Sequence, residues 1–70
     1  MTIGERMMKA RKAKKLSRRA LSEITWISQN SLASYENEYA EPCLSYAVRI
    51  ADALGITLEY LARGKADGGK

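Results

Sequence analysis

The sequence predicts an all-α fold built from five short helices. Alanine, leucine, lysine, arginine and glutamate dominate the composition, and these residues favour helices. Pro42 is the single proline, and no segment alternates polar with apolar residues for long enough to suggest a strand. Seventy residues, 46% of them hydrophobic and 29% charged, suit one small globular domain. The core must be small, so neighbouring helices have to pack closely.

The central segment, LSRRALSEITWISQNSLASYEN over residues 16–37, contains two helical patterns, each preceded by a capping serine. Ser17 and Ser28 leave room for about two turns of helix and a short connection between them. We expect helices over Arg18–Ile24 and Gln29–Glu36. Their apolar positions are Ala20, Leu21, Ile24, Leu32 and Tyr35. The connection is too short for antiparallel helices, so the two should cross steeply as a helix-turn-helix.

A first helix is expected from near Ile3 to near Lys14. Thr2 and Glu5 have the spacing of a capping box, in which each side chain accepts a hydrogen bond from a backbone amide at the helix start. A narrow apolar stripe follows at the positions that share one helical face. These positions are Ile3, Met7 and Ala10.

The fourth helix is expected from Leu44 to Leu54, because Pro42 stops the third helix and Gly55 provides a C-terminal stop. Its apolar face would consist of Leu44, Ala47, Val48, Ala51 and Leu54, with Ile50 at the margin. Thr57 would cap a short fifth helix that carries Leu58 and Leu61 and ends at Gly64. We expect one domain over residues 1–64 and a disordered tail over residues 65–70.

The composition argues against several functional classes. Cys43 is the single cysteine and histidine is absent, so neither an internal disulfide nor a Cys/His metal site is expected. Without histidine, enzyme activity lacks its commonest acid and base. No cofactor or small-molecule ligand is evident. No charged leader or bilayer-spanning apolar run occurs, so no membrane partner and a cytoplasmic location are expected.

The net charge of +4 is distributed unevenly along the chain. Most of the basic residues lie in the first nineteen positions, where only Glu5 opposes them. These basic residues are Arg6, Lys9, Arg11, Lys12, Lys14, Lys15, Arg18 and Arg19. Taken alone, such a run indicates a solvated helix face more often than a nucleic-acid contact. Its position next to a helix-turn-helix makes nucleic-acid binding the better interpretation.

Several local motifs between Ile3 and Leu61 resemble, in order and spacing, the five-helix DNA-binding domain of the lambda repressor, Cro and XRE-type regulators. The motifs are Arg11, Leu16-Ser17, Ile27-Ser28-Gln29, Tyr35-Glu36-Asn37 and Ala51-Asp52-Ala53-Leu54-Gly55. The resemblance implies that the third helix enters the major groove of double-stranded DNA, that the second crosses the backbone, and that dimers read two half-sites.

The resemblance also implies roles for individual residues. Base-edge contacts are expected from Gln29, Asn30 and Ser34, since amide side chains can pair with adenine. Backbone contacts are expected from Arg18, Asn37, Arg19 and Lys15. Arg11 and Glu36 match a structural salt bridge. The alternatives are that the polar residues of the third helix are ordinary surface residues and that Arg11 only joins the basic surface.

Trp26 and Glu38 occupy positions where the resembling proteins ordinarily have glycine, so we expect the turn to be reshaped. The leading functional hypothesis is a sequence-specific transcriptional regulator, a repressor of phage or prophage type. The alternative is a protein-interaction module, such as an antitoxin or antirepressor, anchored by exposed aromatic residues. Those aromatic residues would be Trp26, Tyr39 and Tyr46.

A homodimer is expected, because one small domain reads too few base pairs to find its site. The pairing surface would draw on the apolar residues after the fourth helix. These are Ile56, Leu58, Tyr60 and Leu61. The alternative is that Leu58 and Leu61 complete the core and that pairing occurs only on DNA.

Overall fold

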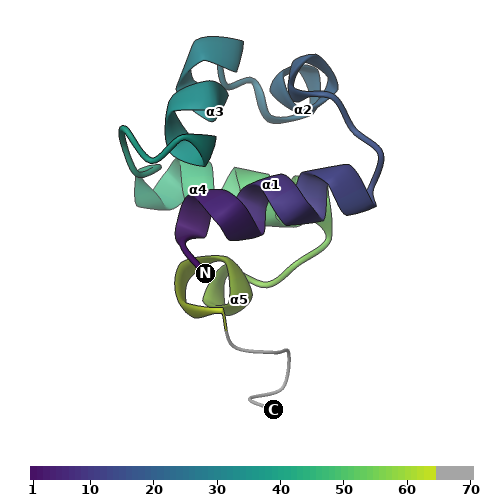
Figure 1. Ribbon diagram of the computed structural model, residues 1–70. Coiled ribbons are helices and arrows are strands. Elements are labelled where there is room, and N and C mark those ends of the chain that lie inside the picture. Colours follow the sequence, from purple (N-terminus) through teal and green to yellow (C-terminus); the bar gives the residue numbers. More distant parts are fainter. Residues whose placement is uncertain (65–70) are drawn as a thin grey trace.

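This computed structural model describes residues 1–64, which contain five helices (Figure 1). They are α1 (Ile3–Ala13), α2 (Arg18–Thr25), α3 (Gln29–Glu36), α4 (Leu44–Leu54) and α5 (Leu58–Arg63). The predicted helices thus form within one residue of their expected bounds. Within residues 1–64, no helix has the length and apolar character needed to cross a membrane. The tail expected over residues 65–70 lies outside the described residues.

The predicted helix caps explain why the boundaries could be read from the sequence. Thr2 and Glu5 form the expected capping box, with a 2.9 Å bond from the Thr2 amide to the Glu5 carboxylate. Ser17, Ser28 and Thr57 each accept a hydrogen bond, at 3.0 to 3.1 Å, from the backbone amide three residues later. Gly55 and Gly64, with φ of 70° and 77°, end α4 and α5. Each cap depends only on nearby residues.

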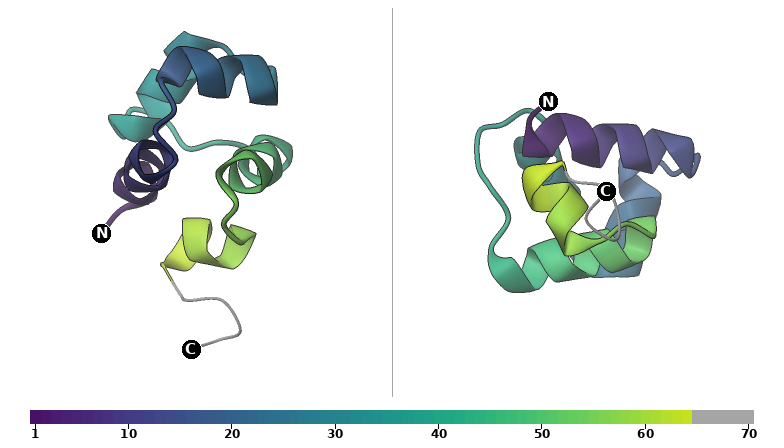
Figure 2. Two further views of the ribbon diagram at one scale, coloured as in Figure 1. Left: turned by 90° about the vertical axis from the view of Figure 1, so that its right-hand side faces the viewer. Right: turned by 90° about the horizontal axis from the view of Figure 1, so that it is seen from below.

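The helices surround one core, with α2 and α3 at the top of Figure 1, α1 and α4 across the middle and α5 below. In that view α2 is seen almost end-on while α3 runs down the picture, so the two cross steeply as expected. Figure 2 shows α1 and α4 on opposite sides of the domain, with α5 across one end. The buried apolar residues are Met7, Leu21, Ile27, Leu32, Ile50, Ala51, Leu54 and Leu61.

The expected inward face of α4 is wrong at three positions. Leu44 and Val48, predicted to face inward, are exposed, at 72% and 40% respectively. Ile50, predicted at the margin, is completely buried. The spacing of apolar residues fixes the width of a helix stripe, but neighbouring helices select which part of it is covered. Contacts of α4 with α2 on one side and α5 on another rotate the buried strip toward Ile50.

The end of α2 also differs from expectation. Ile24, expected to face inward, is 54% exposed, whereas the next residue, Thr25, is buried. Thr25 tolerates burial because its hydroxyl donates a 2.7 Å hydrogen bond to the Leu21 carbonyl. The expected reshaping of the turns does not occur. Trp26 and Glu38 themselves adopt the left-handed conformation, with φ of 62° and 67°.

Candidate nucleic-acid interface

The start of α3 presents a polar surface. The Ser28 hydroxyl accepts from the Ser31 amide at 3.1 Å and also donates to the Ser31 hydroxyl at 3.0 Å, which holds the first turn. Gln29 and Asn30, in that turn, are exposed, and Ser34 lies half-buried about one turn further along. Amide groups place a hydrogen-bond donor beside an acceptor, which is the arrangement that an adenine edge requires.

The far end of α3 is held by a buried ion pair between Arg11 and Glu36. Arg11 Nε lies 2.7 Å from Glu36 Oε2, and Arg11 Nη2 lies 3.1 Å from Oε1. A third guanidinium nitrogen, Nη1, donates to the Leu16 carbonyl at 2.8 Å. The Glu36 side chain has no exposed surface. This two-pronged contact fixes α3 against α1 and therefore sets the direction in which Gln29 and Asn30 point.

Arg18 joins the same carboxylate, which the sequence did not indicate. Its Nε lies 3.2 Å from Glu36 Oε1, and its side chain remains 40% exposed. The contact brings the start of α2 to the end of α3, where Asn37 follows Glu36. Two of the four residues expected to contact a DNA backbone, Arg18 and Asn37, are thus brought to one region. Gln29 and Asn30 lie at the opposite end of α3, about 10 Å away at 1.5 Å per residue.

Arg19 and Lys15 flank this region from the α2 side and are both exposed. Arg19 Nε lies 3.6 Å from Glu23 on the same helix, a solvent-exposed pair that contributes little to stability. Lys15 adopts a left-handed conformation, with φ of 59°, in the connection between α1 and α2. Both side chains remain available to an anion.

Arg6 does not belong to the positive surface expected from the basic run. Its side chain is buried, and it donates to the carbonyls of Leu61 at 2.9 Å and Ala62 at 3.0 Å. It also donates to the Met1 carbonyl. The contacts with Leu61 and Ala62 satisfy carbonyl groups in the last turn of α5, where a cation is favourable. Nothing in the local sequence distinguishes Arg6 from its exposed neighbours, because the two carbonyl groups that it binds in α5 lie more than fifty residues away.

Among residues 1–64, the pKa is shifted for Tyr35 and for Cys43. Burial raises the pKa of Tyr35 above its usual value. A hydrogen bond with Ser45, together with backbone amides at the start of α4, lowers the pKa of Cys43. Neither residue belongs to the polar surface at the start of α3 that Gln29 and Asn30 form.

Comparison with known proteins gives a family model described as a helix-turn-helix, which matches residues 7–61. The chain is 39% identical over 61 residues to the immunity repressor protein of Bacillus phage phi105, covering 87% of this chain and 42% of that protein. It is 30% identical over 62 residues to the SPbeta prophage-derived uncharacterized HTH-type transcriptional regulator YonR of Bacillus subtilis (strain 168), covering 89% and 57%. The chain spans about half the length of these relatives.

Solved structures confirm the predicted fold class. The P22 c2 repressor, in complex with the synthetic operator 9T, superposes with a TM-score of 0.89 and 26% identity, covering 93% of this chain and 98% of that one. The restriction-modification controller protein C.AhdI from Aeromonas hydrophila gives a TM-score of 0.80 and 25% identity, covering 84% and 89%.

Proposed function

Because this chain belongs to the helix-turn-helix family of lambda repressor, Cro and XRE-type regulators, we propose that it binds a specific sequence of double-stranded DNA and represses transcription. One observation carries the proposal. The first turn of α3 exposes Gln29 and Asn30, while a buried ion pair between Arg11 and Glu36 fixes the other end of the same helix. A rigid helix with exposed amides is suited to read base edges in the major groove.

In the proposed complex, different residues provide sequence recognition and phosphate affinity. Gln29 and Asn30 read bases, with Ser34 one turn behind them. Arg18, Arg19, Lys15 and Asn37 hold phosphates and so set the register of α3 without sequence preference. Glu38 and Glu41, both exposed, place negative charge beyond Asn37 and limit how far the phosphate contacts extend in that direction. Repression would follow from occupying an operator, in the cytoplasm.

We propose that the chain acts as a homodimer. Two of the four residues expected at the pairing surface are engaged in packing, because Leu61 belongs to the core and Ile56 packs against it. Leu44 is the better candidate, because it is 72% exposed and borders an apolar groove of about 210 Å³ that Leu58 also lines. Two copies paired there would read an approximately palindromic operator, with half-sites about 34 Å apart.

A titration with duplex DNA tests the proposal. The chain is titrated with random-sequence duplex at several salt concentrations, and its preferred sequence is then selected from a random pool. We expect the affinity to fall steeply with added salt, because each phosphate contact releases counterions. We also expect one sequence family to be enriched. Binding that is absent at low salt would refute the proposal.

A second candidate function is the protein-interaction module. Trp26 and Tyr39 favour it, because both aromatic side chains are more than four-fifths exposed. Tyr46, the third residue expected to anchor a partner, is half-buried and lies under the Arg49 guanidinium, 5.3 Å from its ring centre. A chain that ignores DNA in the titration above would favour this second function.

A further inference from the structure

Glu38 combines an unfavourable backbone conformation with a long-range side-chain contact. Its φ is 67°, in the left-handed region that glycine adopts readily and other residues adopt at a cost. The Glu38 carboxylate accepts a hydrogen bond from the hydroxyl of Thr2, the residue that caps α1. This bond joins the turn after α3 to the start of α1, although the two residues lie 36 positions apart in the chain.

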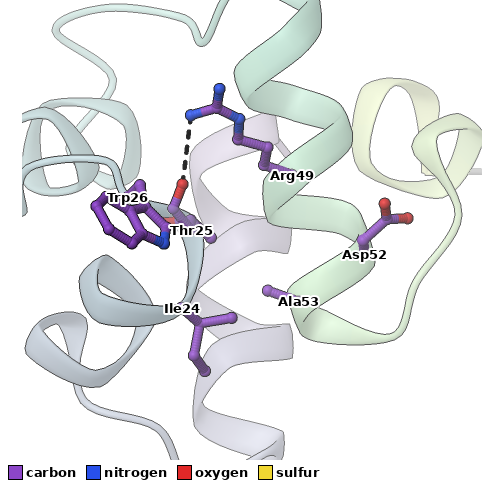
Figure 3. Close-up of a pocket in the computed structure, with 6 residues that line it drawn as sticks. All are labelled: Ile24, Thr25, Trp26, Arg49, Asp52 and Ala53. Carbon is purple, nitrogen blue, oxygen red and sulfur yellow. Dashed lines mark hydrogen bonds between the residues drawn. The ribbon is translucent and has the colours of Figure 1, made fainter.

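Lys15 and Trp26 are the other non-glycine residues of residues 1–64 with a positive φ. Lys15 is exposed in the connection between α1 and α2. Trp26 is 87% exposed at the edge of a groove between α2 and α4, where the hydrogen bond drawn joins Arg49 to Thr25 instead (Figure 3). A left-handed conformation therefore does not by itself produce a contact of the kind that Glu38 makes with Thr2.

The start of α1 packs directly against the end of α3. At Gly4, an added Cβ would lie 2.5 Å from the Tyr35 carbonyl oxygen and 3.0 Å from Glu38 Cγ. Figure 1 shows the same arrangement, with the purple first turn of α1 beside the lower end of α3. The hydrogen bond between Thr2 and Glu38 therefore adds to a packed contact and does not span solvent.

Asn37 lies between two glutamates whose side chains are both held by α1. On one side, Arg11 in the last turn of α1 holds the buried Glu36 carboxylate. On the other side, Thr2 at the start of α1 donates to Glu38. Asn37 itself is exposed. Its backbone is therefore fixed at both neighbouring residues, while its side chain is open to solvent.

We propose that Glu38 is a positioning residue for DNA binding, because its hydrogen bond with Thr2 holds the turn from which Asn37 contacts a phosphate. The inference rests on the function proposed above, in which Asn37 is one of the phosphate-binding residues. An exposed polar side chain on a fixed backbone loses little conformational freedom when it binds. Glu38 thus increases the affinity for DNA without touching it.

The charge of Glu38 acts against its hydrogen bond, since a carboxylate near a phosphate weakens binding. The bond with Thr2 keeps this carboxylate at the start of α1, where the positive end of the helix dipole favours an anion. Substitution by glutamine separates the two effects. The glutamine side chain keeps an oxygen that accepts from the Thr2 hydroxyl but carries no charge.

A pair of neutral substitutions at Thr2 tests the hydrogen bond. Thr2→Gly removes the hydroxyl without changing the charge and leaves a tolerated helix cap, whereas Thr2→Ser keeps the hydroxyl. Thr2→Gly should weaken binding to the preferred duplex by about threefold to tenfold, the effect of one lost hydrogen bond. Thr2→Ser should bind like the wild type, and Glu38→Gln at least as tightly. Wild-type affinity in Thr2→Gly, or an equal loss in Glu38→Gln, would overturn the proposal.

A double-mutant cycle with Asn37→Ala separates positioning from a general loss of stability. If the bond between Thr2 and Glu38 acts through Asn37, Thr2→Gly should weaken binding no further once Asn37 is replaced. With Gln29→Ala, at the opposite end of α3, the effect of Thr2→Gly should instead be additive. The same loss from Thr2→Gly with and without Asn37 would contradict the positioning role.

Amide hydrogen exchange tests the hold on the turn in the absence of DNA. The Tyr39 amide donates to the Ser34 carbonyl at 2.9 Å, which closes the turn around Glu38. This amide should exchange faster in Thr2→Gly than in the wild type or Thr2→Ser, because the turn opens more often without the bond. Unchanged exchange in a chain that binds duplex would refute the positioning role alone. A wild-type chain that binds no duplex, with the faster exchange present, would refute the proposed function and with it the role in DNA binding.

Discussion

Arg18 Nε lies 3.2 Å from the Glu36 carboxylate that Arg11 already holds in two places. The two arginines differ in exposure, since Arg11 is buried and the Arg18 side chain is 40% exposed. Arg11 therefore neutralises Glu36 within the domain, and Arg18 retains a solvent-facing charge. Glu36 orients that charge toward the region where the start of α2 meets the end of α3.

The first prediction concerns Arg18 and DNA. Arg18→Ala should weaken binding to all sequences similarly and make the salt dependence shallower by about one counterion. Arg18→Lys keeps the charge, but a lysine has only one nitrogen and cannot bind Glu36 and a phosphate through separate nitrogens. The affinity of this variant for DNA should therefore lie between those of the wild type and Arg18→Ala. Titration at several salt concentrations measures both effects. An Arg18→Lys variant that binds as tightly as the wild type would show that Glu36 does not orient the side chain.

The second prediction concerns stability. Glu36→Ala should lower the free energy of unfolding by about 3 kcal/mol or more, because it leaves the buried Arg11 charge without a carboxylate. Arg11→Ala should also destabilise the domain, but less, because Arg18 still lies 3.2 Å from the Glu36 carboxylate. Lys12→Ala is the matched control, since Lys12 is exposed on the same helix and should change stability by less than about 0.5 kcal/mol. Thermal and urea unfolding of the three variants provide the comparison. If the Arg11 and Glu36 variants were as stable as Lys12→Ala, the ion pair between Arg11 and Glu36 would contribute nothing to the stability of the domain.

The third prediction concerns sequence recognition. Gln29→Ala should weaken specific binding by about 1 to 3 kcal/mol and relax the preference at one base pair, while the fold stays intact. The reason is that Gln29 is exposed at the start of α3 and contributes no core contact. Selection from random DNA, repeated with the variant, measures the preference. An unchanged preference would remove Gln29 from the set of base-reading residues.

The fourth prediction concerns the contact between α1 and α3. Replacing glycine by alanine within a helix ordinarily stabilises it. At Gly4, however, an added Cβ would lie 2.5 Å from the Tyr35 carbonyl oxygen and 2.7 Å from that of Glu36. Gly4→Ala should therefore destabilise the domain by about 1 to 3 kcal/mol, because α1 must move away from α3. Urea unfolding measures the change, with Lys9→Ala as an exposed control. A more stable Gly4→Ala variant would contradict this close approach.

The fifth prediction concerns Cys43. Its hydrogen bond with Ser45 and the backbone amides of α4 stabilise the thiolate, which lowers the pKa of the Cys43 thiol. More thiolate is then present near neutral pH, so alkylation should be faster there than for an ordinary exposed cysteine. Ser45→Ala should move the pH dependence of the alkylation rate to higher pH. Identical profiles for the two proteins would show that Ser45 does not act on Cys43.

The sequence by itself determined the helices, their boundaries and the helix-turn-helix. Thr2, Ser17, Ser28 and Thr57 cap helices through atoms three residues away, and Gly55 ends α4 through its own backbone. Such interactions act within one turn of helix, so their signals are local and can be read in order along the chain. For the same reason Gln29 and Asn30 could be placed in the exposed first turn of α3.

The tertiary structure alone decided which surfaces are covered and which charges are buried. Packing against α2 and α5 rotated α4 so that Ile50 is buried and Leu44 is exposed. Arg6, on α1, donates hydrogen bonds to carbonyl groups of α5, and Arg18 pairs with Glu36 at the end of α3. Periodicity gives each helix an apolar side, but the choice among similar orientations and partners depends on the shapes of helices that are distant in sequence.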